Sequence, residues 1–192
     1  MDSPEGNRAL LLDKATRLFS ERGYTAVGVE EICAAVFLTK PTLYHYFGSK
    51  RGLLDAIIAE RGAPLLSALR IASVYGHDVP LGLERMAFAL TDFARRDPVF
   101  ARLRLSMSFA PPESEAGAAA AALNAELFAL VEDFFRAAEG DHGNMRGRSR
   151  PIAATFIGTL DSYAGFFLSG AGDLEEGTIR AALRQFMYGI FS

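Results

Sequence analysis

The segment TKPTLYHYFGSK, residues 39–50, gathers the side chains in this sequence that are best suited to binding DNA. It holds two threonines, two tyrosines, one histidine and two lysines, and it has no acidic residue. Hydroxyl and ammonium groups donate hydrogen bonds to phosphate oxygens, and threonine methyl groups or aromatic faces can contact the methyl group of thymine. The composition of the segment therefore predicts contact with a nucleic acid.

The charge of this segment differs from that of the whole chain. The 192 residues carry a net charge of −3, so the chain as a whole does not attract a polyanion. Residues 38–53 contain Lys40, Lys50 and Arg51 and no acidic residue, which gives a local net charge of +3. DNA binding would have to come from this local patch. From charge and periodicity alone, the alternative stays open that three cations solvate one helical face while the aromatic rings pack inside.

Two short helices are expected to position the segment. Apolar residues at i, i+3, i+4 and i+7 predict a helix over residues 29–36, and these residues are Val29, Ile32, Cys33 and Val36. Leu43 and Phe47 predict a second helix that begins near Thr39, because Pro41 is tolerated in a first turn. The spacing of the two helices is typical of a helix-turn-helix, whose second helix enters the major groove of DNA.

The whole chain is expected to be all-α. A first helix is predicted from the apolar stripe that runs from Leu11 to Phe19, and Ser49 is expected to cap the helix after the helix-turn-helix. Further helices are predicted over residues 81–95, 98–107, 112–138 and 152–168, with a glycine-rich basic loop at 139–150. The last helix is expected to open at Asp173, with Glu176 three residues on as in a capping box.

The stretch ATRLFSERGYTAVGVEEICAAVFLTKPTLYHYFGSKRGLLDAI resembles the amino-terminal domain of the tetracycline-repressor (TetR) family. The resemblance covers about residues 8–60 and lies in the elements A..LF...GY, V.EI..A and TKPTLYHYFGSKRGLL, in order and at the right spacing. It implies a helix-turn-helix DNA-binding domain over residues 1–52 and a helical effector-binding and dimerisation domain over residues 53–192. It also implies that the following residues face DNA: Gly28, Thr39, Lys40, Pro41, Thr42, Tyr44, His45 and Lys50.

The same resemblance implies a homodimeric transcription regulator, usually a repressor that leaves a palindromic double-stranded DNA operator when a small-molecule effector binds. Two positions depart from the family pattern. Phe37 stands where the family usually has a glycine with a left-handed backbone, and a bulky residue there is uncommon. Gly28 stands where a serine or threonine usually caps the first helix of the motif, and glycine is a weaker cap.

Aromatic and methionine side chains beyond the amino-terminal domain are individually expected in the core, but together they can wall an apolar cavity. The expected effector is therefore largely hydrophobic, and the candidate pocket residues are Met86, Phe93, Phe100, Met107, Phe128, Phe135, Phe156 and Tyr163. The last two helices carry more apolar surface than a monomer covers easily, which suits a dimer interface. The candidates for it are Phe156, Leu160, Phe167, Leu183, Phe186, Met187 and Ile190.

Other classes of function find little support. The sequence shows no nucleophile–base pair, metal cluster or phosphate loop, so an enzyme, a metal site and a cofactor are not expected. The polar start and the interrupted apolar stretches predict neither a signal peptide nor a membrane span, which favours a cytoplasmic location. The remaining alternative is a module with the same fold that senses a ligand or binds a protein and has weakened or lost DNA binding, given Phe37, Gly28 and the acidic balance.

Overall fold

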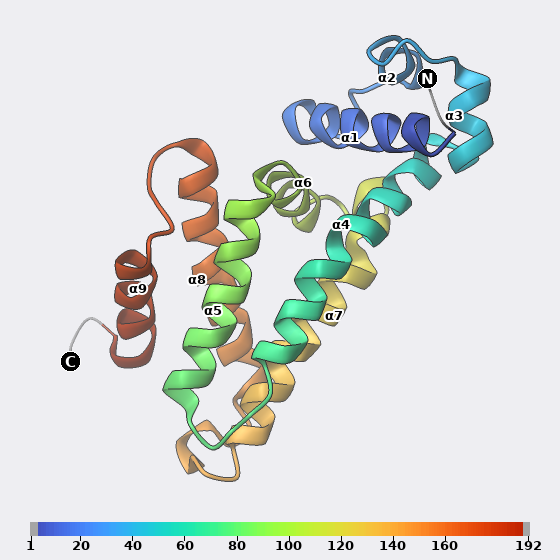
Figure 1. The fold of residues 1–192 in the computed structure, drawn as a ribbon. Coiled ribbons are helices and arrows are strands. Elements are labelled where there is room, and N and C mark those ends of the chain that lie inside the picture. The colour runs from blue at the N-terminus through green and yellow to red at the C-terminus, as the bar shows by residue number, and fades with distance from the viewer. Residues whose placement is uncertain (1–3, 190–192) are drawn as a thin grey trace. The chain divides into compact units, whose positions relative to one another are not determined.

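The computed structural model describes residues 4–189, and over these residues the regular structure is entirely helical. This confirms the predicted all-α fold. In chain order the elements are α1 (Pro4–Arg22), α2 (Val29–Ala34), α3 (Lys40–Phe47), α4 (Lys50–Ala72), α5 (Val79–Arg96), α6 (Pro98–Ser108), α7 (Glu115–Ala138), the short 3₁₀ helix η1 (Gly143–Met145), α8 (Ser149–Ser169) and α9 (Glu176–Tyr188) (Figure 1).

The chain forms two compact units, and neither is a single continuous stretch. The first contains the residues up to Ala63 together with Val99–Leu123, and the second contains Pro64–Pro98 together with the residues from Asn124 onward. The helices α4 and α7 each contribute residues to both units. The predicted functional division after residue 52 stays a prediction.

The core of the first unit is formed where α1, α2 and α3 meet (Figure 1). Most of the stripe predicted for α1 is buried, although Leu18 is half-buried. In α2 and α3 the inward-facing Ile32, Cys33 and Leu43 are buried, whereas Val29 and Phe47 are half-buried. The fully buried side chains here are Leu11, Ala15, Phe19, Ile32 and Leu43, and Cys33 is nearly so. The short α2 and α3 lack enough residues to be stable alone, so this shared core is what holds them helical.

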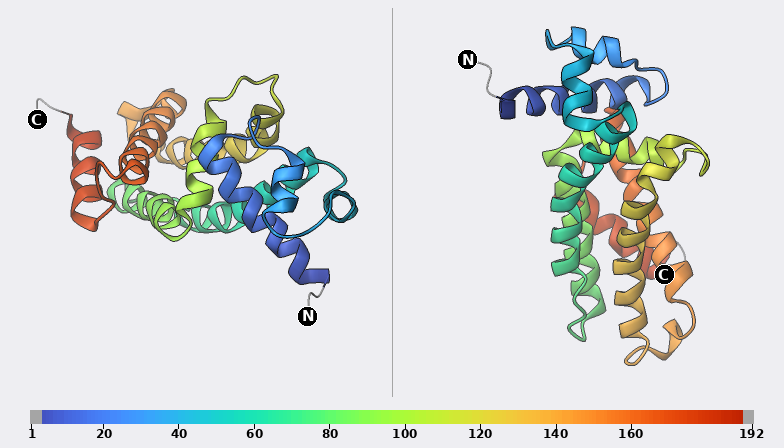
Figure 2. Two further views of the ribbon diagram at one scale, coloured as in Figure 1. Left: turned by 90° about the horizontal axis from the view of Figure 1, so that it is seen from above. Right: turned by 90° about the vertical axis from the view of Figure 1, so that its right-hand side faces the viewer.

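The second unit has an aromatic core, and in it α5 packs against both α8 and α9 (Figures 1 and 2). The rings of Phe134, Phe135 and Phe156 follow one another edge to face, with centroids 5.4 and 6.1 Å apart. Gly82 of α5 faces this core, and a Cβ atom there would lie 2.3 Å from the ring of Phe134. A glycine is therefore required for α5 to pack this closely.

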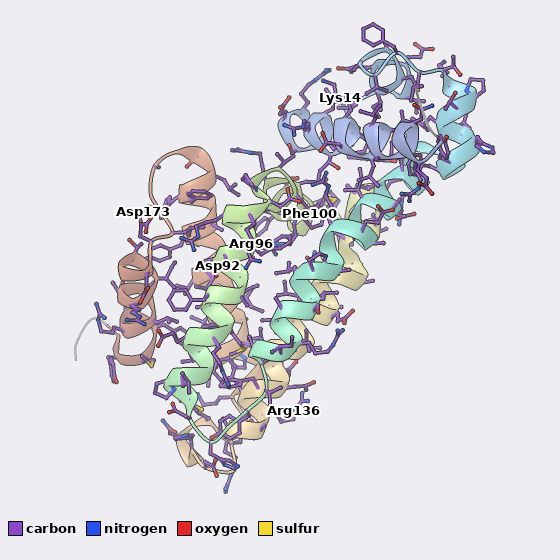
Figure 3. All side chains as sticks on the ribbon, viewed as in Figure 1. Lys14, Asp92, Arg96, Phe100, Arg136 and Asp173 are labelled. Carbon is purple, nitrogen blue, oxygen red and sulfur yellow. The ribbon has the colours of Figure 1, made fainter. Side chains whose placement is uncertain are left out.

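Four predicted helix starts are wrong by two or three residues. The helices predicted over residues 81–95 and 152–168 begin earlier, at Val79 and Ser149. The last helix begins at Glu176 with Glu175 as its N-cap, and the Asp173 carboxylate accepts instead from the Glu175 N–H and the Thr178 hydroxyl. Asp173 thus lies in the turn between α8 and α9, where Figure 3 labels it. The helix predicted from Pro112 begins at Glu115, because a turn from Pro111 to Ser114 precedes it.

Candidate nucleic-acid interface and ligand groove

The predicted recognition helix is α3, and its start has the expected capping. The Thr39 hydroxyl accepts from the Thr42 N–H at 3.4 Å and lies 2.9 Å from the Thr42 hydroxyl. Pro41 sits in the first turn of α3. Backbone N–H groups there have no partner within the helix, so a proline without an N–H costs no hydrogen bond. Leu43 is completely buried and anchors the helix to the core. Thr39 and Pro41 therefore determine where α3 begins, and the burial of Leu43 determines which face of α3 points to solvent.

The face of α3 opposite Leu43 is open to solvent. Pro41, Tyr44 and His45 are exposed, and Thr42 is half-buried. Tyr44 is 46% exposed although it is a large aromatic residue. Hydroxyls, an imidazole and a phenol on one exposed helical face can read base edges and donate to phosphates. These predicted residues are thus brought together on one surface.

Lys40 belongs to the same surface, but its ammonium is already paired. It makes an exposed ion pair with the Glu30 carboxylate of α2. The hydrogen bond to Glu30 raises the pKa of Lys40 and lowers that of Glu30. A phosphate oxygen would have to compete with Glu30 for this lysine, so Glu30 reduces the local positive charge that the sequence suggested.

Lys50, the first residue of α4, lies against aromatic rings. Its Nζ is 4.1 Å from the ring centroid of Tyr24 and 5.9 Å from that of Phe19. Partial burial lowers the pKa of Lys50, and the nearby Glu115 carboxylate opposes this effect. Sequence reasoning placed Lys50 among the residues that face DNA but missed this aromatic seat, because Tyr24 and Glu115 are distant in the chain.

The turn between α2 and α3 keeps the geometry of a glycine turn although Phe37 occupies it. The φ of Phe37 is +56°, in the left-handed region. Its N–H donates to the Ala34 carbonyl at 3.2 Å, and the Leu38 N–H donates to the Cys33 carbonyl at 3.0 Å. These two bonds form a Schellman motif, whose left-handed position is usually glycine. Phe37 is 96% exposed, so its ring does not pack into the turn or change its geometry.

Gly28 is the N-cap of α2, as the resemblance implied. Its backbone is extended, with φ −89° and ψ 152°, and it offers no side-chain cap to the free N–H groups of α2. A Cβ atom at this position would meet nothing within 4 Å. The site has room for the serine or threonine that the family pattern carries.

The second unit contains an open groove of about 1010 Å³ lined by residues of α5, α7, η1, α8 and α9. Its floor is apolar and buried, and it includes Leu83, Phe135 and Ala182. Its rim is polar and more exposed, and it includes Arg148 and Gln185. The groove therefore suits a molecule that has both an apolar and a polar part.

One wall of the groove is a stripe of hydroxyls on α8. The hydroxyls of Thr155, Thr159 and Ser162 each donate to the carbonyl four residues earlier, at 3.0, 2.8 and 2.8 Å. Since their protons are engaged, these oxygens face the groove as acceptors. Their spacing along the helix is visible in the sequence, but nothing local indicates that they face a groove.

Of the eight predicted pocket residues, the groove is lined by Phe135 and Tyr163. Five of the eight residues are buried in the core: Met86, Phe100, Met107, Phe135 and Phe156. Phe93 and Phe128 are half-buried, and the Phe128 ring lies 5.0 Å from the guanidinium of Arg150. The assignment of these residues to an effector pocket stays a prediction.

The predicted interface residues divide into two groups. Phe156, Leu160 and Leu183 are buried within their own chain, whereas Phe167, Phe186 and Met187 are half-buried. Ile190 lies outside the described residues. Among the described helices, α8 is the one that is long and apolar enough to cross a membrane by length and composition, and only 22% of its most apolar stretch is buried. Much of an apolar helix is thus left uncovered by the chain itself.

Comparisons with known proteins agree with this arrangement. Residues 11–57 match the family model described as "Bacterial regulatory proteins, tetR family". Over 182 residues, which are 95% of this chain and 81% of the relative, the chain is 26% identical to the HTH-type transcriptional activator FasR of Mycolicibacterium smegmatis. Over 53 residues, 28% of this chain and 26% of the relative, it is 43% identical to the HTH-type transcriptional repressor KstR2 of Rhodococcus jostii.

The fold is also that of solved regulators. The crystal structure of the transcriptional regulator FadR from Bacillus subtilis, in complex with stearoyl-CoA, superposes with a TM-score of 0.77 at 14% identity, and the match covers 95% of this chain and 98% of that one. The likeness therefore extends from the helix-turn-helix through the helices that form the groove.

Proposed function

We propose, from the membership of this chain in the TetR family of DNA-binding transcriptional regulators, that it binds a palindromic operator through α3 as a homodimer and is released by an amphipathic effector. The exposed face of α3 carries this proposal. Thr42, Tyr44 and His45 occupy one side of a helix whose other side is fixed by Leu43. A helix held in this way presents its side chains to base edges without first having to be ordered.

The two departures from the family pattern do not favour the alternative in which DNA binding is lost. The Schellman turn at Phe37 supports an undistorted entry into α3, and the exposed ring blocks none of the helix's own packing. The extended backbone of Gly28 is that of an N-cap. The missing side-chain cap costs only a few tenths of a kcal/mol.

The test of operator binding is selection of bound sequences from random double-stranded DNA, followed by titration at several salt concentrations. We expect a palindromic site, and an affinity that falls steeply as salt rises. Replacing Tyr44 with alanine should weaken operator binding by about tenfold. Phe109→Ala removes another exposed aromatic residue of the same unit and should leave the affinity unchanged. Absence of any binding at low salt would instead support the module without DNA binding.

The uncovered side of α8 supports the homodimer. Apart from the sides that face the core and the groove, α8 presents Ala154, Gly158 and Gly165 together with Asp161, and the three small residues allow another helix to approach closely. Apart from the neighbouring residues and backbone of α8 itself, no described atom lies within 4 Å of a Cβ built on Gly158 or Gly165. Leucine at position 158 is therefore compatible with the chain's own fold but would obstruct a second copy. We expect Gly158→Leu to be folded and to sediment as a monomer, whereas a dimer of unchanged stability would place the interface elsewhere.

The groove supports the effector part of the proposal. Its buried floor can hold an acyl or other apolar chain, and the Arg148 guanidinium at its rim can hold an anionic group. Because the similar FadR of Bacillus subtilis was crystallised with stearoyl-CoA, a long-chain acyl-CoA is the first ligand to test. Stearoyl-CoA, stearate and free coenzyme A would be titrated separately into the labelled operator complex. We expect stearoyl-CoA to release DNA, and Arg148→Ala to weaken that release.

We infer a repressor acting in the cytoplasm, in which the effector favours a conformation with low operator affinity. The named relatives include both an activator and a repressor, so the direction of regulation needs its own measurement. A reporter gene placed behind the selected operator should be repressed by the chain and released by the effector. An increase in reporter expression with the chain present would show activation instead.

A further inference from the structure

Lys50 is held by a small cluster that joins three elements of the first unit. Its Nζ lies 4.1 Å from the ring centroid of Tyr24, and the Tyr24 ring meets Phe19 edge to face at 5.1 Å. The Tyr24 hydroxyl donates to Oε2 of Glu115 at 2.7 Å. The lysine thus rests on a ring whose far end is tied to the first residue of α7.

The link between Tyr24 and Glu115 is well defined. Tyr24 is only 6% exposed, and its burial, followed by the hydrogen bond to Glu115, raises the pKa of its hydroxyl. The hydroxyl therefore stays protonated and remains a donor at neutral pH. Because the ring is packed against Phe19 and bonded at its tip, it has little freedom to rotate away from Lys50.

Glu115 is presented by a tight turn. The Ser114 N–H donates to the Pro111 carbonyl at 2.9 Å, and the Ser114 hydroxyl accepts from the Gly117 N–H at 3.1 Å. A Cβ atom on Gly117 would lie 2.3 Å from the Pro111 oxygen, so only glycine allows the turn to close this tightly. The turn thereby holds the backbone at Glu115, whose exposed carboxylate accepts from the Tyr24 hydroxyl.

The seat on Tyr24 leaves the donors of Lys50 available. A ring face attracts an ammonium without taking up its hydrogen bonds as a carboxylate does. Among the described residues, Lys50 makes ring contacts but has no carboxylate within ion-pair distance, in contrast to Lys40 with Glu30. Its ammonium is therefore ordered and still able to donate to an added anion.

We propose that Glu115 is a positioning residue for operator binding, which acts by holding the Tyr24 ring and so orders the Lys50 ammonium for a backbone phosphate. The inference rests on the proposed function, in which Lys50 contacts DNA. Glu115 itself carries the wrong charge to touch a phosphate, so its effect must pass through Tyr24 and Lys50.

The first test separates the hydrogen bond of Glu115 from its charge. Glu115→Ala removes both, and we expect about threefold weaker operator binding, the range of an exposed cation–π contact. Glu115→Gln keeps an acceptor for the Tyr24 hydroxyl and should retain wild-type affinity or exceed it. Glu113→Ala, which removes an exposed carboxylate two residues earlier, is the matched control and should not weaken binding. Weaker binding of Glu113→Ala, or equal loss for Glu115→Gln and Glu115→Ala, would overturn the proposal.

The second test asks whether the effect passes through Lys50. Lys50→Ala should weaken operator binding and reduce the slope of log affinity against log salt by about 0.9, one phosphate contact. In that background Glu115→Ala should cause no further loss, and Tyr24→Phe should behave like Glu115→Ala in both backgrounds. A loss from Glu115→Ala that persists without Lys50 would show a purely structural role. If Lys50→Ala changes neither affinity nor slope while operator binding remains, the inference fails and the proposed function stands.

Discussion

The turn at Phe37 allows the cost of a left-handed backbone in this protein to be measured directly. With a φ of +56°, Phe37 is held in a region that costs an L-residue about 1–2 kcal/mol. Phe37→Gly removes this cost, but glycine loses about 0.5–1 kcal/mol more conformational entropy on folding. The ring is 96% exposed, so deleting it gives up almost no buried area. The balance is a net stabilisation of about 0.7 kcal/mol.

The assay is urea unfolding at one fixed protein concentration, because the stability of the proposed dimer would depend on concentration. The expected gain corresponds to a rise in the urea midpoint of roughly 0.2–0.7 M. Phe37→Ala is the matched control, since it deletes the ring but keeps a Cβ atom at a left-handed position. We expect its stability to lie within about 0.5 kcal/mol of wild type, the range of ordinary surface substitutions.

Two results would refute this reasoning. If Phe37→Ala and Phe37→Gly have the same stability, the strain relieved at the left-handed position only equals the extra entropy that glycine loses, and the expected net stabilisation is absent. If Phe37→Gly is the less stable of the two, glycine's entropy outweighs the relief of strain. In either case amide exchange at Leu38, whose N–H closes the turn on the Cys33 carbonyl, would show whether the turn itself has opened.

Three further predictions concern single groups. Gly28→Ser should add a side-chain cap to α2 without a clash, and raise stability by a few tenths of a kcal/mol in the same urea assay. Glu30→Gln should free Lys40 and strengthen binding to non-specific DNA by about twofold to fivefold, measured at low salt. Hydrogen bonds from His77 and Tyr75 lower the pKa of Asp141 in the folded protein. The ionised carboxylate therefore stabilises the fold above its unfolded pKa of about 4, and this stabilisation is lost as pH falls through its folded pKa. The difference in urea midpoint between wild type and Asp141→Asn should therefore shrink on acidification below that range, and a difference independent of pH would contradict it.

The helix-turn-helix could be predicted from the sequence because its determinants are local. Thr39 caps α3 through a residue three positions on, Pro41 starts the helix, and Leu43 sets its rotation. The left-handed backbone at Phe37 was also predictable, since the Schellman bonds involve only residues within five positions of one another. The pairing of Lys40 with Glu30 was not, because it depends on how two helices cross.

The groove could not be predicted, because no local pattern contains it. Its lining comes from α5, α7, η1, α8 and α9, and its floor combines Leu83, Phe135 and Ala182, which lie far apart in the chain. The basic loop at 139–150, to which the sequence alone assigns no role, contributes Arg148 to the rim. A mixed lining of this kind favours an amphipathic ligand over the largely hydrophobic effector that aromatic residues alone suggested.

The last helices show why an apolar stripe does not identify its own partner. Phe156 and Leu160 have the spacing of an interface and are covered by their own chain, in which α5 packs against α8. Gly158 and Gly165 lie on another side of the same helix, where a Cβ atom added to either glycine would meet no neighbour within 4 Å. An apolar surface indicates that it is covered by something, whereas the size of its residues indicates how closely a neighbouring helix can approach. The small residues of α8 are therefore the better guide to where a second copy would pack.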